Sequence, residues 1–234
     1  MPRSDCSSIA RSRWRGFKQP TYQLVAIILC SFALASPSAT ALAQDTVGEV
    51  TSVVGVANLQ RGANVTGVSQ SMPIDVHDRL STMQKAKLTV TFHDGSKLVL
   101  SESSSFTIDQ YAMTSVTRTA ASIGLWAGHL RAIVNLAVGK PPNFQVHTPN
   151  AIAAVRGTEF ETAFIADRPC PEDRNCMRYT TVGVLHGVVA VANVSTPTQT
   201  VKVNEGYETT VACESPATAP APLGMEELGA PGYH

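Results

Sequence analysis

The six histidines are the side chains best suited to metal binding or acid–base chemistry, and they are scattered along the chain. They are His77, His93, His129, His147, His186 and His234. None stands at the short spacing from a second histidine or a cysteine that zinc sites show. Asp75 and Asp78 lie close together but lack the oxygen ligands at alternate positions that calcium loops carry. We therefore expect no metal site.

Glu159 and Glu161 lie two positions apart, which places both carboxylates on one face of a strand. Acid–base catalysis needs two carboxyl groups in a cleft with separated pKa values, whereas this arrangement is typical of a solvated edge. The sequence contains no nucleophile elbow, phosphate-cradling glycine loop or dinucleotide motif. We predict that the chain is not an enzyme and uses no cofactor.

The first 43 residues have the pattern of a signal peptide. Basic residues at positions 11–18 precede an apolar run at 24–35 and the small-x-small sequence Ala41-Leu42-Ala43. Cleavage after Ala43 would leave Gln44 as the first residue of a periplasmic or secreted protein. The alternative is an uncleaved inner-membrane anchor, but the run of about a dozen residues is short of the ~20 that a spanning helix needs.

Removal of this leader changes the charge balance of the chain. The full chain has 18 basic and 18 acidic residues, and residues 44–234 keep 13 and 17, a net charge of about −4. Nucleic-acid binding depends on basic side chains that neutralise phosphates, and no Lys/Arg cluster remains after the leader. We therefore expect no nucleic-acid partner.

Three cysteines follow the leader: Cys170, Cys176 and Cys213. Their spacing does not fit a zinc knuckle. In an oxidising compartment, Cys170 and Cys176 are the candidate disulfide, because they would close a short loop and leave Cys213 single. Pairing with Cys213 stays open as an alternative.

Apolar and polar residues alternate with a period of two, which predicts strands with one buried face. Leu88, Val90 and Phe92 alternate with polar residues, and the chain turns back after Asp94-Gly95, a step typical of a type I′ hairpin. Further strand candidates cover residues 47–54, 57–61, 106–108, 130–134, 144–146, 159–165, 179–185, 188–194, 201–203 and 207–211.

The alternation of apolar and polar residues predicts a single all-β domain over residues 44–214. The one apolar segment that could be a helix, residues 122–138, is broken by glycines and carries the β-branched Ile133 and Val134. A glycine precedes an apolar strand at Gly95, Gly128, Gly187 and Gly206, which indicates short strands with tight corners. We expect a solenoid-like or rolled domain, with a β-sandwich as the alternative. Residues 215–234, rich in Pro and Ala, are predicted to be a disordered tail.

Four ordered stretches resemble the FecR domain family, and together they cover residues 47–211. They are Asp78-Arg79-Leu80-Ser81-Thr82 with residues 86–108; Gly128-His129-Leu130-Arg131 with residues 144–151; Val155-Arg156-Gly157-Thr158-Glu159-Phe160; and residues 182–191 with Val203-Asn204-Glu205-Gly206-Tyr207. The resemblance implies a β-rich, solenoid-like or rolled domain in the periplasm. Full-length regulators of this family also carry a cytoplasmic sigma-factor-binding segment and a membrane helix. Only about twenty residues precede the apolar run here, so we expect a stand-alone module without the sigma-factor role.

The motif residues are interpreted as structural. We expect Arg156 at a strand corner, with its guanidinium bound by carbonyls or by a carboxylate such as Glu159 or Asp109. Gly157 would then adopt a backbone angle that other residues avoid. Thr148-Pro149 would lie at a sheet edge or corner, because proline has a fixed φ and no N–H donor. The same structural interpretation covers Asp94, Gly95, Gly128, Thr158, Phe160, Gly187 and Gly206. The alternative is that Arg156 and Asn150 face a groove and bind a carboxylate or a glycan.

Trp126 and Tyr111 are expected to pack in the core, whereas an exposed Trp126 would indicate a glycan or peptide surface. The leading functional hypothesis is an exported, non-enzymatic binding or signalling module that presents a groove or a sheet edge to a protein of the envelope. The alternative is a structural component that binds glycan. In both cases the mature chain would not span the membrane, and the identity of the partner stays open.

Overall fold

The computed structural model describes residues 46–115, 117–136 and 144–224. The chain divides into two compact units, Met1–Leu42 and Ala43–His234, and all described residues belong to the second. The predicted signal peptide and its cleavage site at Ala43 and Gln44 therefore lie outside the described residues. In the described part of the chain, no helix has the length and apolar character needed to cross a membrane.

The described residues form 17 strands and no helix, which confirms the predicted all-β class. The strands are β1 Thr46–Val54, β2 Ala57–Arg61, β3 Asn64–Gly67, β4 Pro73–Asp75, β5 Arg79–Thr82, β6 Lys87–Phe92, β7 Lys97–Leu100, β8 Ser105–Met113, β9 Arg118–Ile133, β10 Phe144–His147, β11 Ala151–Val155, β12 Glu159–Ala166, β13 Arg178–His186, β14 Val188–Asn193, β15 Val201–Asn204, β16 Tyr207–Ala212 and β17 Ala221–Pro222.

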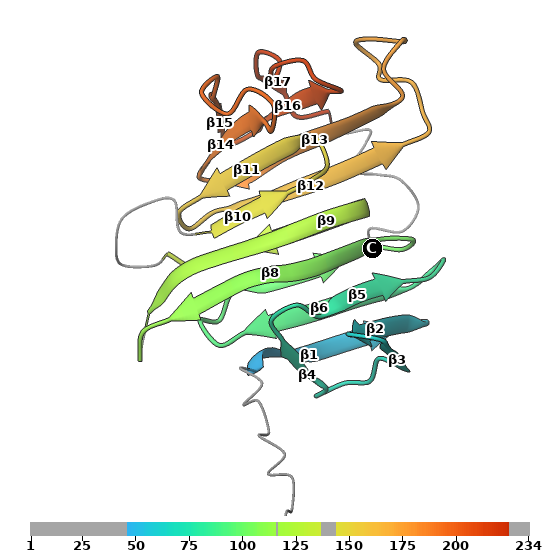
Figure 1. Cartoon of the computed structure of the whole chain (residues 1–234). Helices are drawn as coiled ribbons and strands as arrows, with labels where there is room; N and C mark the ends of the chain where they lie inside the picture. The colour runs from blue at the N-terminus through green and yellow to red at the C-terminus, as the bar shows by residue number, and fades with distance from the viewer. Residues whose placement is uncertain (1–45, 116, 137–143, 225–234) are drawn as a thin grey trace, which may run out of the picture. The chain divides into compact units, whose positions relative to one another are not determined.

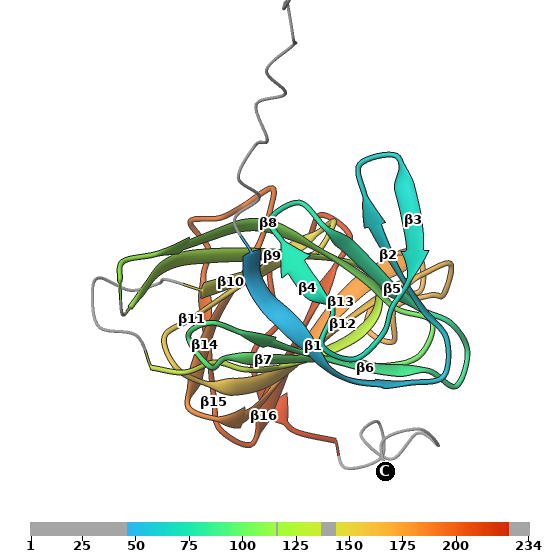
Figure 2. The same cartoon turned by 90° about the horizontal axis from the view of Figure 1, so that it is seen from below.

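The strands form two layers that share β9 (Figure 1). Layer A has the order β4-β1-β6-β7-β9-β12-β13-β16-β17. Layer B has the order β3-β2-β5-β8-β9-β10-β11-β14-β15. All neighbours are antiparallel except β9 and β10. The chain changes layer after every one or two strands, which produces the rolled, solenoid-like arrangement seen along its length in Figure 2.

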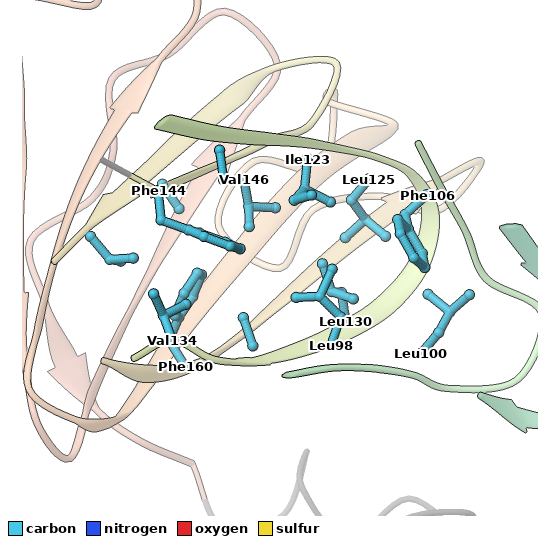
Figure 3. Close-up of a cluster of buried hydrophobic side chains, with 14 of the residues drawn as sticks. Leu98, Leu100, Phe106, Ile123, Leu125, Leu130, Val134, Phe144, Val146 and Phe160 are labelled. Atoms are coloured by element: carbon cyan, nitrogen blue, oxygen red, sulfur yellow. The ribbon is translucent and has the colours of Figure 1, made fainter. Parts of the chain in front are cut away.

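The core lies between the two layers (Figure 3). Strand β6 buries Leu88, Val90 and Phe92 and leaves the residues between them partly exposed, as its period predicts. Leu98, Leu100, Leu130 and Phe160 of layer A share one buried cluster with Phe106, Ile123, Leu125, Phe144 and Val146 of layer B. Each such side chain contributes about 1.5 to 3 kcal/mol relative to an exposed one, so this interlayer contact is the main source of stability.

The β6–β7 hairpin is present, but its turn differs from the predicted type I′. Four residues, 93–96, separate the strands, and φ is positive at Gly95 (78°) but not at Asp94. A type I′ turn needs positive φ at both central residues. The carboxylate of Asp94 instead accepts hydrogen bonds from the Ser96 backbone N–H (3.0 Å) and hydroxyl (2.7 Å). Asp94 therefore holds the loop by hydrogen bonding.

Gly128 is the point at which β9 passes from layer B to layer A. Residues up to Ala127 pair with β8, and residues from Gly128 onward pair with β12. The φ of Gly128 is +77°, and an added Cβ atom would lie 2.7 Å from the Cβ and 2.8 Å from the Cα of Ser104. Both the backbone angle and the space require glycine here.

Part of the predicted disordered tail is ordered, so that prediction is wrong for Ser215 to Gly224. Strand β17 pairs with β16, Thr218 N–H donates to Thr210 C=O (2.9 Å) and Leu223 N–H donates to Gly206 C=O (2.9 Å). Prolines are tolerated because this segment forms the outer edge of layer A, where no further strand needs its N–H groups. Residues 225–234 of the same prediction lie outside the described residues.

The substitution Gly128→Ala should destabilise the domain more than Gly206→Ala, measured as free energies of unfolding in urea. Gly206 has nearly the same φ (+78°) but nothing within 4 Å of an added Cβ. The left-handed backbone alone costs about 1 to 2 kcal/mol. The collision with Ser104 should add about 1 to 3 kcal/mol. Equal losses in the two variants would show that the contact with Ser104 does not constrain β9.

Candidate functional site

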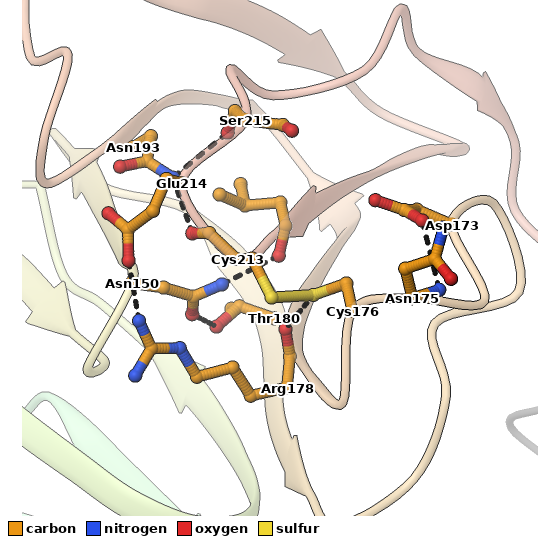
Figure 4. Close-up of a disulfide and its surroundings, with 11 residues drawn as sticks. Asn150, Asp173, Asn175, Cys176, Arg178, Thr180, Asn193, Cys213, Glu214 and Ser215 are labelled. Atoms are coloured by element: carbon orange, nitrogen blue, oxygen red, sulfur yellow. Dashed lines mark hydrogen bonds and ion pairs between the residues drawn. A yellow bond between two sulfur atoms is a disulfide. The ribbon is translucent and has the colours of Figure 1, made fainter.

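One end of the molecule is closed by a disulfide between Cys176 and Cys213 (Figure 4). Cys176 ends the loop between β12 and β13, and Cys213 directly follows β16. Strands β13 and β16 pair with Tyr179 opposite Ala212, so the two cysteines meet at the end of this ladder, with their Cα atoms 5.8 Å apart. The Cys213 N–H also donates to the Arg178 carbonyl (3.1 Å).

This pairing corrects the predicted disulfide between Cys170 and Cys176. Cys170 is a buried free thiol in the same small apolar cluster as Cys176, Tyr179 and Ala212. Its N–H donates to the Cys176 carbonyl (2.8 Å), so the two residues face each other across the loop without a covalent bond. Short spacing favoured Cys170, but the pairing of β16 with β13 brings Cys213 to the same place.

A pocket of about 490 Å³ lies beside the disulfide, open to solvent. Its apolar lining includes Pro149, Phe164 and Met177, and its rim carries Arg178 paired with Glu214 (2.5 Å). Hydrogen bonds from the Ser195 hydroxyl and from Arg178 lower the pKa of Glu214, which keeps this carboxylate ionised. An apolar floor with a charged rim is suited to an apolar side chain of a binding partner.

A buried hydrogen-bond network includes Thr148 and Asn150, the residues on either side of Pro149 in the pocket lining. The Asn150 side-chain amide donates to the Val211 carbonyl (2.8 Å), and its oxygen accepts from the Thr180 hydroxyl (2.6 Å). The hydroxyls of Thr180 and Thr148 are 2.7 Å apart. Asn150 is 1% exposed, so the alternative in which it binds a ligand is wrong. Thr148 is buried and Pro149 is exposed at the β10–β11 corner, as expected.

Arg156 does not have the structural role that the sequence predicted. Its side chain is exposed, and no hydrogen bond or ion pair joins it to the other described residues. The two proposed partners are engaged elsewhere, because Glu159 binds Arg131 (2.9 and 2.5 Å) and Asp109 accepts from Thr107 (2.6 Å). Gly157 has positive φ (79°), Thr158 is buried at 7% exposure and Phe160 is fully buried, so the rest of the motif does support the fold.

The buried arginine of this protein is Arg118, at the start of β9, which the sequence analysis missed. Its guanidinium forms an ion pair with Asp94 and donates to the Ser96 hydroxyl (2.9 Å) and the Asn135 carbonyl (3.1 Å). It also lies 5.1 Å from the centre of the Phe144 ring. The sequence offered one indirect sign of this arginine, the predicted turn at its ion-pair partner Asp94. The network ties the β6–β7 hairpin to both ends of β9.

Tyr111 packs beside this network, which confirms its predicted place against the core. Its ring stacks on Phe92 with centroids 5.0 Å apart. Its hydroxyl accepts a hydrogen bond from the Asp94 N–H (3.2 Å). Burial and the nearby Asp94 carboxylate raise the pKa of Tyr111, so the phenol stays protonated.

Two further arginines, Arg61 and Arg131, each bind two carboxylates. Arg61 binds Asp75 (2.8 Å) and, through two nitrogens, Asp78 (2.8 and 2.6 Å), so these carboxylates anchor the edge strands of the first half. Glu159 and Glu161 both face Arg131, and burial raises the pKa of Glu161 while Arg131 opposes this shift. Within the described residues 46–115, 117–136 and 144–224, no three His, Cys, Asp or Glu side chains are grouped to hold a metal ion.

Trp126 is 45% exposed on the outer face of layer B, so its predicted place in the core is wrong. Trp126 lies in a bulge of the β8–β9 pairing, and its side chain points outward because it alternates with the buried Leu125. Its indole N–H donates to the Thr107 hydroxyl (2.9 Å), so the ring has a fixed orientation on the surface.

A family model described as FecR protein matches residues 78–190. The chain contains a FecR domain. Two crystal structures of a proposed anti-sigma factor from Parabacteroides distasonis ATCC 8503, at 1.65 and 2.50 Å resolution, are each 17% identical to it with a TM-score of 0.48. The alignments cover 64% of this chain and 62% of the other, so this chain spans less than two thirds of that protein. No curated protein matches the chain.

The matched part of the FecR domain begins just before β5 and ends within β14. The strands outside it, β1–β4 and β15–β17, complete both layers at their two ends. The glycines at the corners of the FecR domain, Gly95, Gly128, Gly187 and neighbouring Gly206, all have positive φ. FecR domains belong to signalling or regulatory modules of the cell envelope, and the chain carries a module of this class.

Replacing Arg118 with Ala should destabilise the FecR domain by about 3 to 5 kcal/mol, because Asp94 would remain buried without its cation. The matched control is Arg131→Ala, whose partly exposed ion pairs should contribute less than about 1 kcal/mol. Chemical denaturation of both variants measures the difference. Similar stabilities would contradict an anchoring role for Arg118.

Mass spectrometry of the non-reduced, digested protein should show a Cys176–Cys213 peptide and a free thiol at Cys170. Cys213→Ala should then lower the free energy of unfolding by about 4 kcal/mol, the chain-entropy value for a bond that spans 37 positions. Cys170→Ala, the control, removes one buried thiol and should cost less. A Cys170–Cys176 peptide, or a larger loss of stability in Cys170→Ala than in Cys213→Ala, would favour the Cys170–Cys176 pairing instead.

Proposed function

We propose that this chain is an exported, non-enzymatic FecR-type module that binds a protein of the cell envelope and takes part in signalling or regulation there. The FecR match to residues 78–190 supports the class of function. The leader pattern in residues 1–43 and the Cys176–Cys213 disulfide support an oxidising compartment outside the cytoplasm. The proposed partner site is the pocket beside that disulfide.

The shape and rigidity of the pocket carry this proposal. Met177 is 50% exposed at its mouth, and Phe164 forms part of its wall. Methionine side chains adapt to varied apolar partners, and they are common on surfaces that bind protein segments. The disulfide and the buried Asn150 network hold the surrounding loops, so little conformational freedom would be lost on binding.

The arrangement of the carboxylates supports a non-enzymatic role. Glu159 and Glu161, the pair considered for acid–base catalysis, lie along β12 and are neutralised by Arg131 on the outside of layer A. The buried carboxylates of Asp78 and Asp94 are each bound to an arginine. These groups are therefore committed to ion pairs that hold strands together.

A photo-crosslinking amino acid at position 177 should capture a specific envelope protein in intact cells. The control places the same amino acid at Val65, which is 63% exposed on the edge strand β3, far from the pocket residues in sequence and in layer order. We expect a discrete adduct in the envelope fraction, several-fold stronger at 177 than at 65. In the same experiment, Glu214→Arg should weaken the adduct without lowering the melting temperature, because Glu214 is an exposed rim residue.

Equal yields at positions 177 and 65 would contradict the pocket as the partner site. An adduct found with cytosolic proteins alone would contradict export. A specific adduct at 177 that is insensitive to Glu214→Arg would assign binding to the apolar floor without the charged rim.

A further inference from the structure

The outer face of layer B carries a compact group of side chains that neither the core nor the proposed partner pocket uses. Strands β8, β9 and β10 are neighbours there, and Gly124 pairs with Thr107 on one side and with His147 on the other. The alternate residues Ile108, Ile123 and Val146 are fully buried. Thr107, Trp126, Asp109 and His147 therefore belong to the opposite, outward face of the layer.

The indole of Trp126 lies along this face above Gly124. Its Nε1 atom is 3.1 Å from the position that a Cβ of Gly124 would take, and it donates to Thr107 on the neighbouring strand. The side chain is 45% exposed, so part of the indole is open to solvent. A Cβ at position 124 would also lie 2.8 Å from the Thr107 hydroxyl, so the glycine leaves room for these side chains.

Two β-bulges flank the Thr107–Gly124 pair, and each contains one member of the group. One lies between the Ser105–Ala127 and Phe106–Leu125 pairs and contains Trp126, and the other lies between the Ile108–Ile123 and Gln110–Ser122 pairs and contains Asp109. Bulges turn side chains out of the regular alternation and are common beside binding sites. Here Trp126 and Asp109 keep the outward direction that alternation with the buried Leu125 and Ile108 gives them, and they lie near a residue without a side chain.

Polar groups surround the ring at hydrogen-bonding distances from one another. The Thr107 hydroxyl donates to Asp109 Oδ1 (2.6 Å), which leaves Oδ2 beside Gly124, 2.8 Å from the position of an added Cβ. Arg79 pairs with Thr107 in register, and its Nε donates to the Ser105 hydroxyl (3.0 Å). Burial lowers the pKa of His147, with Asp109 opposing the shift, so the imidazole adds a neutral donor and acceptor.

We propose that this surface, formed by Trp126, Thr107, Asp109, Arg79 and His147, is a binding site for a neutral glycan. The exposed face of the indole matches the apolar C–H face of a pyranose ring. Asp109 accepts and Arg79 donates hydrogen bonds to neighbouring hydroxyl groups. The two charges cancel, which favours a neutral saccharide over an acidic one. The site shares no residue with the pocket beside the disulfide, so it adds a second function to the proposed one.

Fluorescence of Trp126 provides the test in the full chain. The sequence has two tryptophans, Trp14 and Trp126, so Trp14→Phe leaves Trp126 as the single reporter. We expect a saturable change in its emission with cellotetraose or chitotetraose and none with tetragalacturonic acid. Calorimetry should show that Trp126→Ala abolishes binding, that Trp126→Phe retains part of it, and that Asp109→Ala weakens it about tenfold, the loss of one charged hydrogen bond.

Two controls separate binding from folding and from the partner pocket. Asp109 and Trp126 are surface residues, so their variants should keep the melting temperature of the parent, and Met177→Lys should leave saccharide affinity unchanged. The proposal is overturned if neither neutral saccharide binds at 10 mM, if a proline-rich peptide binds in their place, or if Trp126→Ala only lowers stability. In that last case the ring would serve only to cover Gly124. Failure of crosslinking at position 177 would leave this result unaffected.

Discussion

Strand β9 is hydrogen-bonded in both layers, and this continuity depends on the backbone conformation of Gly128. Before this residue the strand pairs with β8 and β10, and after it with β7 and β12. The first eight strands lie on one side of β9 and the last eight on the other. The register of both halves is therefore set against a single strand, and the face-to-face packing of Leu98, Leu130 and Phe160 with Ile123 and Phe144 follows from it.

Buried charges fix the ends of the strands that pack around this core. Arg118 joins the β6–β7 loop to the start of β9 and to the segment after it, and Arg61 joins β2 to the β4–β5 corner. These charged groups hold the scaffold together, so the two binding surfaces that we propose lie elsewhere. One is the pocket at the disulfide, and another is the outer face of layer B around Trp126.

The all-β class, the strand positions and the corner glycines could be predicted, because each depends on local spacing or on a local backbone angle. The alternation of Leu88, Val90 and Phe92 specifies a buried face whatever that face packs against. Arg118 and Arg156 could not be assigned in this way. Nothing in the sequence around either arginine indicates which guanidinium pairs with Asp94, which lies 24 positions before Arg118. The exposure of Trp126, by contrast, follows from alternation with the buried Ile123 and Leu125, so the local pattern could have placed this side chain outward. The ordered segment at Ser215 to Gly224 depends on a free edge of β16, which composition alone does not reveal.

The three cysteines near the start of β13 have a consequence for how the disulfide can form. Cys170 and Cys176 are separated by five residues, whereas the native bond spans 37 positions. The shorter loop closes at a smaller entropic cost, and both of its cysteines precede Cys213 in the chain. If Cys170 and Cys176 paired first, the native bond would form by thiol–disulfide exchange, in which the Cys213 thiolate attacks Cys176 and releases the Cys170 thiolate. Because Cys170 ends fully buried, this exchange has to precede the final packing of β13 against β16.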